Sequence, residues 1–223
     1  MLELPLTFLQ RPAAATTPRP WLLVLMHGVG SNEQDLFSLA PQIPDRFHVI
    51  SLRAPHRMGP GSHAWFDFSI EPGGARSYNT AQEAASRALV AQCVEAASAQ
   101  LDIPPDRVVV GGFSQGCIMA LSLLLTRPEL MHAAVVWHSR LMAELLPLTA
   151  SHDALVGRKL WLSHGTSDNV IPLANALAVR HHMETLPVTV TYREFPGEHE
   201  IRPSELAATV AWLEGLSTTP TAF

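Results

Sequence analysis

The sequence predicts an α/β protein with a mostly parallel central sheet and helices on both faces. Continuous apolar runs of strand length recur along the chain, as in strands that are buried on both faces. Longer segments with helical spacing lie between them, and this alternation is typical of parallel sheets. The segment 107–125 also reads as a strand, a sharp turn and an apolar helix, with Gly112-Phe-Ser-Gln-Gly116 at the turn.

The bulk composition fits one such domain spanning residues 1–223. A chain of 223 residues can bury a full core, and a second domain would have little room. Hydrophobic residues make up 47% and charged residues 16%, as expected for a globular protein. The net charge of −5 and the absence of a Lys/Arg cluster argue against a nucleic-acid partner.

The N-terminus and the cysteines predict a cytoplasmic protein. Glu3 and Pro5 interrupt the first apolar residues, and a basic leader and a small-residue cleavage site are missing, which argues against a signal peptide. Every apolar run is shorter than a membrane span, so no transmembrane segment is expected. Cys93 and Cys117 lie in apolar helical patterns and are expected to be buried free thiols. The sequence leaves a homodimer open.

The expected elements follow in chain order. The segment 1–20 combines an edge strand at 4–10 with a Pro-rich loop at 11–20. Buried strands are expected at 21–26, 47–52, 108–110, 133–137, 159–163 and 188–195. Helices are expected at 79–100, after Gly116, at 172–186 and at 203–216, the last two with an early proline. Residues 56–77 read as a long loop, and 217–223 as a frayed tail.

The turn at Ser114 has the pattern of a nucleophile elbow, which lifts one hydroxyl above the end of a central strand. Gly112 and Gly116 would lack side chains because the strand and helix backbones approach each other there. Ser114 would lie at a helix N-terminus, where free N–H groups favour negative charge. A chance Gly-rich turn has the same five letters, but the buried strand before it and the apolar helix after it favour the elbow.

A serine hydroxyl is a weak nucleophile and needs a base and an orienting carboxylate. In elbow-containing enzymes the acid and then the histidine follow the serine, each on a loop after a strand. The loop after strand 159–163 carries one acid, Asp168, and the loop after strand 188–195 carries one histidine, His199. These two residues are the predicted partners of Ser114.

The chain has 11 histidines, so the competing residues need separate reasons for rejection. The other histidines that follow Ser114 lie mid-helix, precede the acid loop or begin it: His181, His182, His132, His138, His152 and His164. Three competing acids precede their strand or flank the histidine directly: Asp153, Glu198 and Glu200. No His-Glu-x-x-His motif or paired-cysteine spacing occurs, so no metal site is expected.

Two backbone N–H groups would stabilise the oxyanion of the tetrahedral intermediate. One belongs to Gln115, directly after the serine, and the other is assigned to Val29 in the loop after strand 21–26. This loop, 27–30, lacks the Lys-Ser/Thr of a P-loop and the third glycine of a dinucleotide fingerprint. A phosphate-binding role is therefore disfavoured.

With these residues in place, the sequence resembles the phospholipase/carboxylesterase family, which includes acyl-protein thioesterases and bacterial carboxylesterases. The matching motifs run in order over nearly the whole chain: Leu25-Met-His-Gly-Val-Gly30, Arg53-Ala-Pro55, Trp65-Phe-Asp67, Gly112-Phe-Ser-Gln-Gly116, His164-Gly-Thr-Ser-Asp168, Val170-Ile-Pro172 and His199. The resemblance implies a single-domain α/β-hydrolase without a large lid. It also implies a triad of Ser114, Asp168 and His199, no cofactor, and hydrolysis of a small-molecule ester or thioester.

One segment departs from the family pattern. Relatives usually have Leu-Ser-Gly after the strand that follows the nucleophile helix, whereas this chain has Trp137-His-Ser-Arg140. The family places this position near the acyl pocket, so His138 and Arg140 are expected to shorten it and to favour short- to medium-chain acyl groups. Trp65 and Phe66 either line the cleft or anchor the long loop in the core.

Other functions fit the same motifs. A long-chain acyl-protein thioesterase or a lysophospholipase is the main alternative within the family. Peptide or lactone hydrolysis is a second, although serine rather than cysteine at the elbow disfavours the dienelactone type. A non-catalytic binding protein of this fold would normally have lost part of the triad, and all three residues are present.

Overall fold

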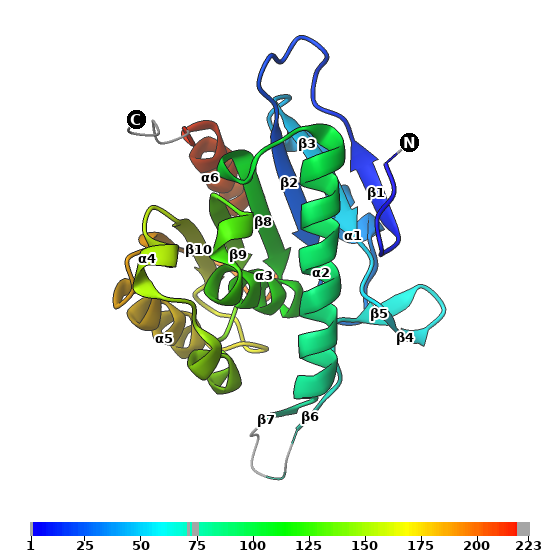
Figure 1. Cartoon of the computed structure of the whole chain (residues 1–223). Coiled ribbons are helices and arrows are strands. Elements are labelled where there is room, and N and C mark those ends of the chain that lie inside the picture. The colour runs from blue at the N-terminus through cyan, green and yellow to red at the C-terminus, as the bar shows by residue number, and fades with distance from the viewer. Residues whose placement is uncertain (1, 71, 73–75, 218–223) are drawn as a thin grey trace.

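A computed structural model describes residues 2–70, 72 and 76–217. Its central sheet has seven strands in the order β1-β3-β2-β8-β9-β10-β11 (Figure 1). The strands are β1 (Phe8–Arg11), β2 (Trp21–Met26), β3 (Phe47–Leu52), β8 (Val108–Phe113), β9 (Ala133–Trp137), β10 (Lys159–Gly165) and β11 (Thr189–Phe195). Only β1 pairs antiparallel, with β3, so the predicted mostly parallel sheet is confirmed.

Helices cover both faces of this sheet (Figure 1). The α-helices are α1 (Gln34–Phe37), α2 (Thr80–Leu101), α3 (Gln115–Thr126), α4 (His152–Leu155), α5 (Leu173–Glu184) and α6 (Pro203–Glu214). Short 3₁₀ turns lie at Ala40–Gln42, Pro105–Arg107, Pro128–Leu130 and Ala143–Leu148. Residues of α2, α3 and α5 pack in one core cluster, and residues of α1 and α6 pack in the other.

The strand β2 explains why the apolar runs of this sequence are continuous rather than alternating. Its even-numbered residues, such as Leu22 and Val24, belong to the first cluster, and its odd-numbered residues, such as Leu23 and Leu25, belong to the second. All six residues of β2 are buried. Because side chains alternate across a strand, a strand covered on both faces needs apolar residues at every position.

The long helix α2 has a defined start and end. The side chain of Asn79 accepts a hydrogen bond from Gln82 N at 3.1 Å, as an N-cap does. Asp102 ends the helix with a left-handed backbone (φ 52°).

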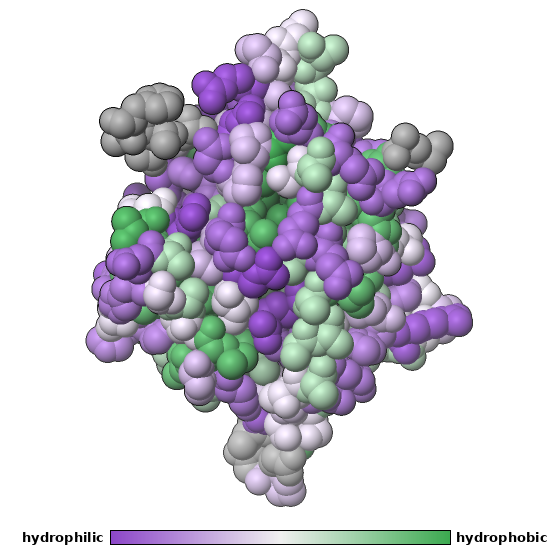
Figure 2. All heavy atoms as spheres, in the orientation of Figure 1, coloured by the Kyte–Doolittle hydropathy of each residue, from purple (hydrophilic) through white to green (hydrophobic). Residues whose placement is uncertain are grey.

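Figure 2 shows one face of the protein, on which hydrophilic residues surround separate groups of hydrophobic ones. None of the described helices is both long and apolar enough to cross a membrane.

Several predicted boundaries need correction. The first strand covers Phe8–Arg11 instead of 4–10. The expected loop at 56–77 contains two small hairpins, β4 (His56–Gly59) with β5 (Ser62–Ala64), and β6 (Phe68–Ile70) with β7 (Arg76–Tyr78). These strands are short and partly exposed, so they lack the buried apolar runs that marked the others. The expected frayed tail lies outside the described residues except for Ser217.

Candidate active site

The carboxyl ends of five parallel strands bring the candidate residues to one edge of the sheet. β2 leads into Val29, β8 into Ser114, β9 into His138, β10 into Asp168 and β11 into His199. Neighbouring strands end at nearly the same level, since Phe113 at the end of β8 pairs with Trp137 at the end of β9, and Gly165 of β10 pairs with Phe195 of β11. Ligand sites in parallel sheets lie at this edge because strands point their following loops there.

Ser114 occupies a strained turn between β8 and α3. Its backbone angles, φ 55° and ψ −115°, lie in a region that residues with a Cβ rarely adopt. The turn is this tight because neighbouring backbones touch: a Cβ on Gly112 would collide with Gly116, and one on Gly116 would collide with the carbonyl groups of Met26 and His27. The two glycines therefore allow the tight turn that positions the Ser114 hydroxyl.

His199 lies beside that hydroxyl. Its Nε2 is 2.9 Å from Ser114 Oγ, and its Nδ1 is 2.7 Å from Asp168 Oδ2. The three side chains predicted from the sequence thus form one continuous row of hydrogen bonds. In this geometry Nε2 can accept the serine proton while the carboxylate fixes the ring orientation.

Asp168 is held by its own loop. Its Oδ1 accepts hydrogen bonds from the backbone N–H groups of Val170 and Ile171 at 2.9 and 2.8 Å, which leaves Oδ2 for the histidines. The loop packs directly against the one that carries His199, because a Cβ on Gly165 would overlap backbone atoms of Gly197. The Asp168 side chain is fully buried, so water competes little for its oxygens.

A second histidine, His138, contacts the same carboxylate. His138 Nδ1 lies 2.9 Å from Asp168 Oδ2, and His138 Nε2 lies 3.3 Å from Glu205 Oε2. Glu205, in the first turn of α6, also accepts a 2.6 Å hydrogen bond from Ser163 Oγ. His138 is fully buried, so the expectation that it lines the acyl pocket is wrong. The order of residues along the chain gave no reason to link His138 to Asp168. No sequence motif indicated a role for Glu205.

The protonation states follow from burial and from these contacts. Burial lowers the pKa of His199, and the charges of His138 and Arg76 lower it further, against a raising effect of Asp168. Burial also opposes the charged form of His138, but its contacts with Glu205 and Asp168 prevail and raise its pKa. Hydrogen bonds from His199, Ile171 and His138 outweigh burial and lower the pKa of Asp168. His199 is thus suited to remain neutral, as a general base must.

The two predicted oxyanion residues, Val29 and Gln115, line the same pocket as Ser114. The Gln115 side chain has a separate structural role: its Oε1 accepts from Trp65 N at 2.8 Å and its Nε2 donates to Phe66 O at 2.6 Å. His27, which precedes the oxyanion loop, accepts at Nε2 from Ala54 N at 3.1 Å. The side chain of Gln115 therefore ties the segment 65–66 to the nucleophile turn, a contact that sequence motifs alone did not reveal.

Of the four predicted substrate-binding residues, two line the pocket and two lie in the core. Phe66 and Arg140 line it, together with Val29, Phe68, Arg76, Tyr78, Ser114, Gln115, Ile118 and Ile171. Trp65 is fully buried, and its indole Nε1 donates to His27 O at 2.9 Å. Trp65 therefore anchors the loop in the core, which was the alternative interpretation of this residue.

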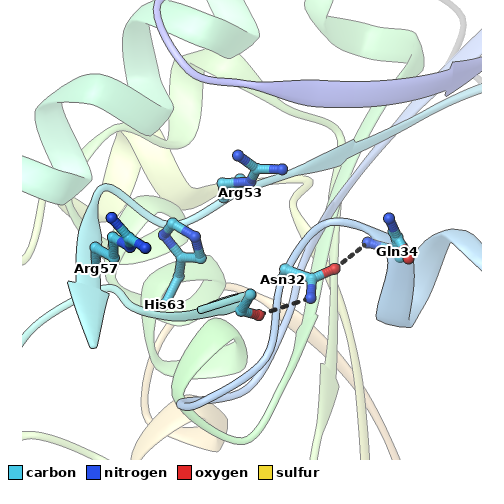
Figure 3. Close-up of a pocket in the computed structure, with 6 residues that line it drawn as sticks. Asn32, Gln34, Arg53, Arg57 and His63 are labelled. Atoms are coloured by element: carbon cyan, nitrogen blue, oxygen red, sulfur yellow. Dashed lines mark hydrogen bonds between the residues drawn. The ribbon is translucent and has the colours of Figure 1, made fainter. Parts of the chain in front are cut away.

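A separate cavity, of about 390 Å³, is lined by polar side chains that include Asn32 and Gln34 (Figure 3). Its lining includes Arg53, Arg57 and His63, but none of the three residues in the Ser114 row. The hairpin β4–β5 braces the loop here, since Gly30 N donates to His63 O at 2.8 Å. The hairpin thus supports the loop that carries Val29, and Ser114 is not among the residues that line this cavity.

Within the described residues, one group of side chains has the composition of a metal site: His138, His164 and Asp168, with ligand atoms within 4.8 Å of one another. These atoms already have hydrogen-bond partners. His164 Nε2 lies 2.7 Å from Ile171 O, and Asp168 Oδ2 faces His199 and His138. These hydrogen bonds account for the close approach of the three side chains.

Comparison with known proteins agrees with this geometry. The family model described as Phospholipase/Carboxylesterase matches residues 12–217. The chain belongs to the phospholipase/carboxylesterase family. Esterase YpfH of Escherichia coli is 30% identical over 168 residues, which cover 73% of this chain and 68% of the relative. Acyl-protein thioesterase 1 of Schizosaccharomyces pombe is 26% identical over 197 residues, covering 82% and 84%.

Solved structures of two carboxylesterases share the fold. The Bacillus cereus carboxylesterase superposes with a TM-score of 0.77 at 22% identity, covering 94% of this chain and 93% of that one. A carboxylesterase from Mesorhizobium loti gives 0.81 at 23% identity, covering 97% and 99%. The predicted α/β-hydrolase fold is therefore confirmed, and family membership makes the protein an esterase-type hydrolase.

Proposed function

We propose that the protein hydrolyses carboxylic esters or thioesters with short- to medium-chain acyl groups through an acyl-enzyme on Ser114. The observation that carries this proposal is the row of hydrogen bonds from Ser114 Oγ to His199 Nε2 (2.9 Å) and from His199 Nδ1 to Asp168 Oδ2 (2.7 Å). A lone serine would be a poor nucleophile, whereas a serine in such a row can lose its proton as it attacks.

The proposed reaction has two halves. His199 takes the Ser114 proton as Oγ bonds to the carbonyl carbon, and the amides of Val29 and Gln115 stabilise the oxyanion. His199 then gives the proton to the leaving alcohol or thiol as the ester bond breaks. A water molecule, deprotonated by His199, attacks the acyl-enzyme, and the acid leaves as Ser114 regains its proton. Asp168 holds the imidazole tautomer throughout.

The size of the pocket supports a short acyl group. The cavity beside Ser114 is narrow, with a volume of about 20 Å³, and Ile118, Phe66 and Arg140 are among the side chains that line it. A longer acyl chain would have to displace these side chains. We therefore expect rates to fall beyond medium chain lengths.

A third cavity, of about 290 Å³, adjoins His199 and is distinct from the Ser114 pocket. Leu36, Leu39 and Ile201 are among the residues that line it. His199 must reach the leaving oxygen to protonate it, so the leaving group has to lie near this ring. We propose that this cavity takes the alcohol or thiol part of the substrate. The division would leave the small pocket for the acyl part.

Fluorophosphonate labelling tests the nucleophile. The wild-type protein should be labelled at Ser114, and Ser114→Ala should lose both the label and about 10⁶ in turnover. Full esterase activity in Ser114→Ala would end the proposal. A folded wild type that takes no label and hydrolyses no ester would instead favour a non-catalytic binding protein.

Rates across p-nitrophenyl esters from acetyl to palmitoyl, beside an acyl-thioester, test the substrate range. A decline after medium chains would support the small pocket. Undiminished palmitoyl turnover would favour the alternative, a long-chain acyl-protein thioesterase or a lysophospholipase. The cytoplasmic location and the homodimer stay predictions, to be tested by cell fractionation and by sedimentation.

A further inference from the structure

Two arginines share the small pocket with the nucleophile. Arg76 begins β7 in the second hairpin, and Arg140 follows β9, so distant parts of the chain bring both to Ser114. The other lining residues are apolar or uncharged, and none of them is acidic. The pocket that would receive the scissile carbonyl is thus positively charged.

Neutral groups and an aromatic ring hold these two guanidinium groups. Arg76 Nη2 donates to Val170 O at 3.1 Å, and the guanidinium lies 5.0 Å from the centre of the Phe68 ring. Arg140 Nη1 donates to Tyr78 Oη at 3.3 Å, while its buried Nε has no hydrogen-bond partner in the described part of the chain. Burial lowers the pKa of Arg76, and the charge of Arg140 lowers it further.

Several of the other arginines of the protein, although not all of them, are paired with acids. Arg53 lies 2.5 Å from Glu33, and Arg87 lies 3.0 Å from Glu83. Among the residues that the structure describes, no carboxylate lies within 4.0 Å of Arg76 or Arg140. Two like charges in a partly buried pocket repel each other, and a bound anion would relieve that repulsion.

We propose that the protein prefers esters whose acyl part carries a carboxylate, which Arg76 and Arg140 bind beside Ser114. This inference rests on the proposed function and names its substrate class. Guanidinium groups bind carboxylates through paired, charge-assisted hydrogen bonds. The contact would orient the scissile carbonyl toward Ser114 and would take no part in the bond changes.

The charges around His199 favour a substrate carboxylate in the acyl part, which lies in the Ser114 pocket, over one in the alcohol part. The cavity assigned to the leaving group has Asp35 and Glu200 in its lining and no basic residue besides His199. An anionic alcohol would meet these acids, whereas an anionic acyl group would meet the two arginines. The products would be a dicarboxylate and a neutral alcohol.

Two matched pairs of alkyl esters test the inference, with acid release followed by pH-stat titration. The acyl pair is ethyl hydrogen succinate and ethyl succinamate, which differ only in carboxylate against carboxamide. The alcohol pair is butyryloxyacetate and butyryloxyacetamide. We expect kcat/KM for the succinate to exceed that for the succinamate by about 10-fold or more, as for hydrogen bonds to charged groups. The alcohol pair should show no preference for the charged member.

Arginine variants assign the preference to the two side chains. Arg76→Gln and Arg140→Gln should each bring the succinate-to-succinamate ratio toward one, and the corresponding Lys variants should keep part of it. Arg57→Gln, in the other cavity, is the matched control and should keep the ratio. If a Gln variant does not fold, a fall of the wild-type ratio with added NaCl gives the same information.

The outcomes separate this inference from the proposed function. Equal rates for both acyl esters, with activity still dependent on Ser114, would overturn the charge preference alone. A preference confined to the alcohol pair, or a ratio that survives both Gln substitutions, would overturn the assignment to an acyl carboxylate. Hydrolysis of none of the four esters would overturn the inference and the proposed function together.

Discussion

The imidazole Nδ1 of His138 lies 2.9 Å from Asp168 Oδ2, the oxygen that also faces His199. The other nitrogen of His138 lies 3.3 Å from Glu205, so one buried ring stands between two carboxylates. These contacts raise the pKa of His138 in spite of its burial, and so favour a positive charge directly behind the proposed acid of the triad. His138 is therefore placed to influence the base without touching the substrate.

The first prediction concerns the pH dependence of turnover. The base must be neutral, so kcat/KM should fall as pH drops through the pKa of His199, which lies below its usual value. Because the positive charge of His138 lowers that pKa, His138→Gln should raise it and move the acid limb to higher pH. The pH profile of p-nitrophenyl butyrate hydrolysis measures this shift.

A suitable control for His138→Gln is His181→Gln, since His181 is exposed on α5. The control profile should match the wild type. If the acid limb of His138→Gln stays in place or moves to lower pH, His138 has no electrostatic effect on the base.

The second prediction links His138 to stability. Its pKa is higher in the folded than in the unfolded protein, so its contribution is fully present below about pH 6.5 and is lost as pH rises through the folded value. Breaking such a buried pair costs about 3 kcal/mol. We expect the loss in unfolding free energy of His138→Gln to approach this figure at pH 6 and to shrink at pH 9. Urea denaturation at both pH values measures it, and a loss that grows with pH would contradict the assignment.

The sequence predicted the sheet and the meeting of Ser114, His199 and Asp168 because both leave local signals. Buried parallel strands need continuous apolar runs, and the order serine, acid, histidine narrows the search to two loops. His138 left no such signal. Its departure from the family pattern was visible and was interpreted as a change in the pocket, whereas its partner Glu205 lies 67 residues away, on α6. Contacts of that kind depend on packing in three dimensions.

The hairpins in segment 56–77 were missed for a related reason. Their strands have three or four residues and pair mainly within each hairpin, so their sequence shows no periodic pattern. The second hairpin nevertheless supplies Arg76 and Tyr78 to the pocket. Chain order could not indicate that these residues lie beside Arg140.

The third prediction tests the close approach at the nucleophile turn. Gly116→Ala would place a Cβ against the carbonyl groups of Met26 and His27. These are backbone atoms, so the clash can be relieved only by moving the main chain. We expect a loss of about 3 kcal/mol or more in unfolding free energy, and little activity because Ser114 would shift. Gly59→Ala meets nothing within 4 Å and should stay within about 0.5 kcal/mol of the wild type. Equal stability of the two variants would refute the tight packing.

The fourth prediction concerns the orienting acid. Asp168→Asn keeps the size of the side chain but places an amide against two imidazole rings, so His199 loses the tautomer it needs. We expect kcat to fall by about 10⁴ while the fold, followed by circular dichroism, persists. Asp153→Asn, on the exposed surface of α4, serves as a control and should keep full activity. A mild effect of Asp168→Asn would place the orienting acid elsewhere.

The last prediction concerns the thiols. Burial raises the pKa of Cys93 to about 11 and that of Cys117 to about 12. Cys117 also donates to Ser114 O at 2.8 Å, directly under the nucleophile. The thiolate is the reactive form, so iodoacetamide at pH 8 should modify neither residue in the native protein and should leave esterase activity intact. Mass spectrometry should find both thiols modified only after denaturation in urea. Rapid labelling of Cys117 in the native protein, with loss of activity, would mean that helix α3 opens at its start.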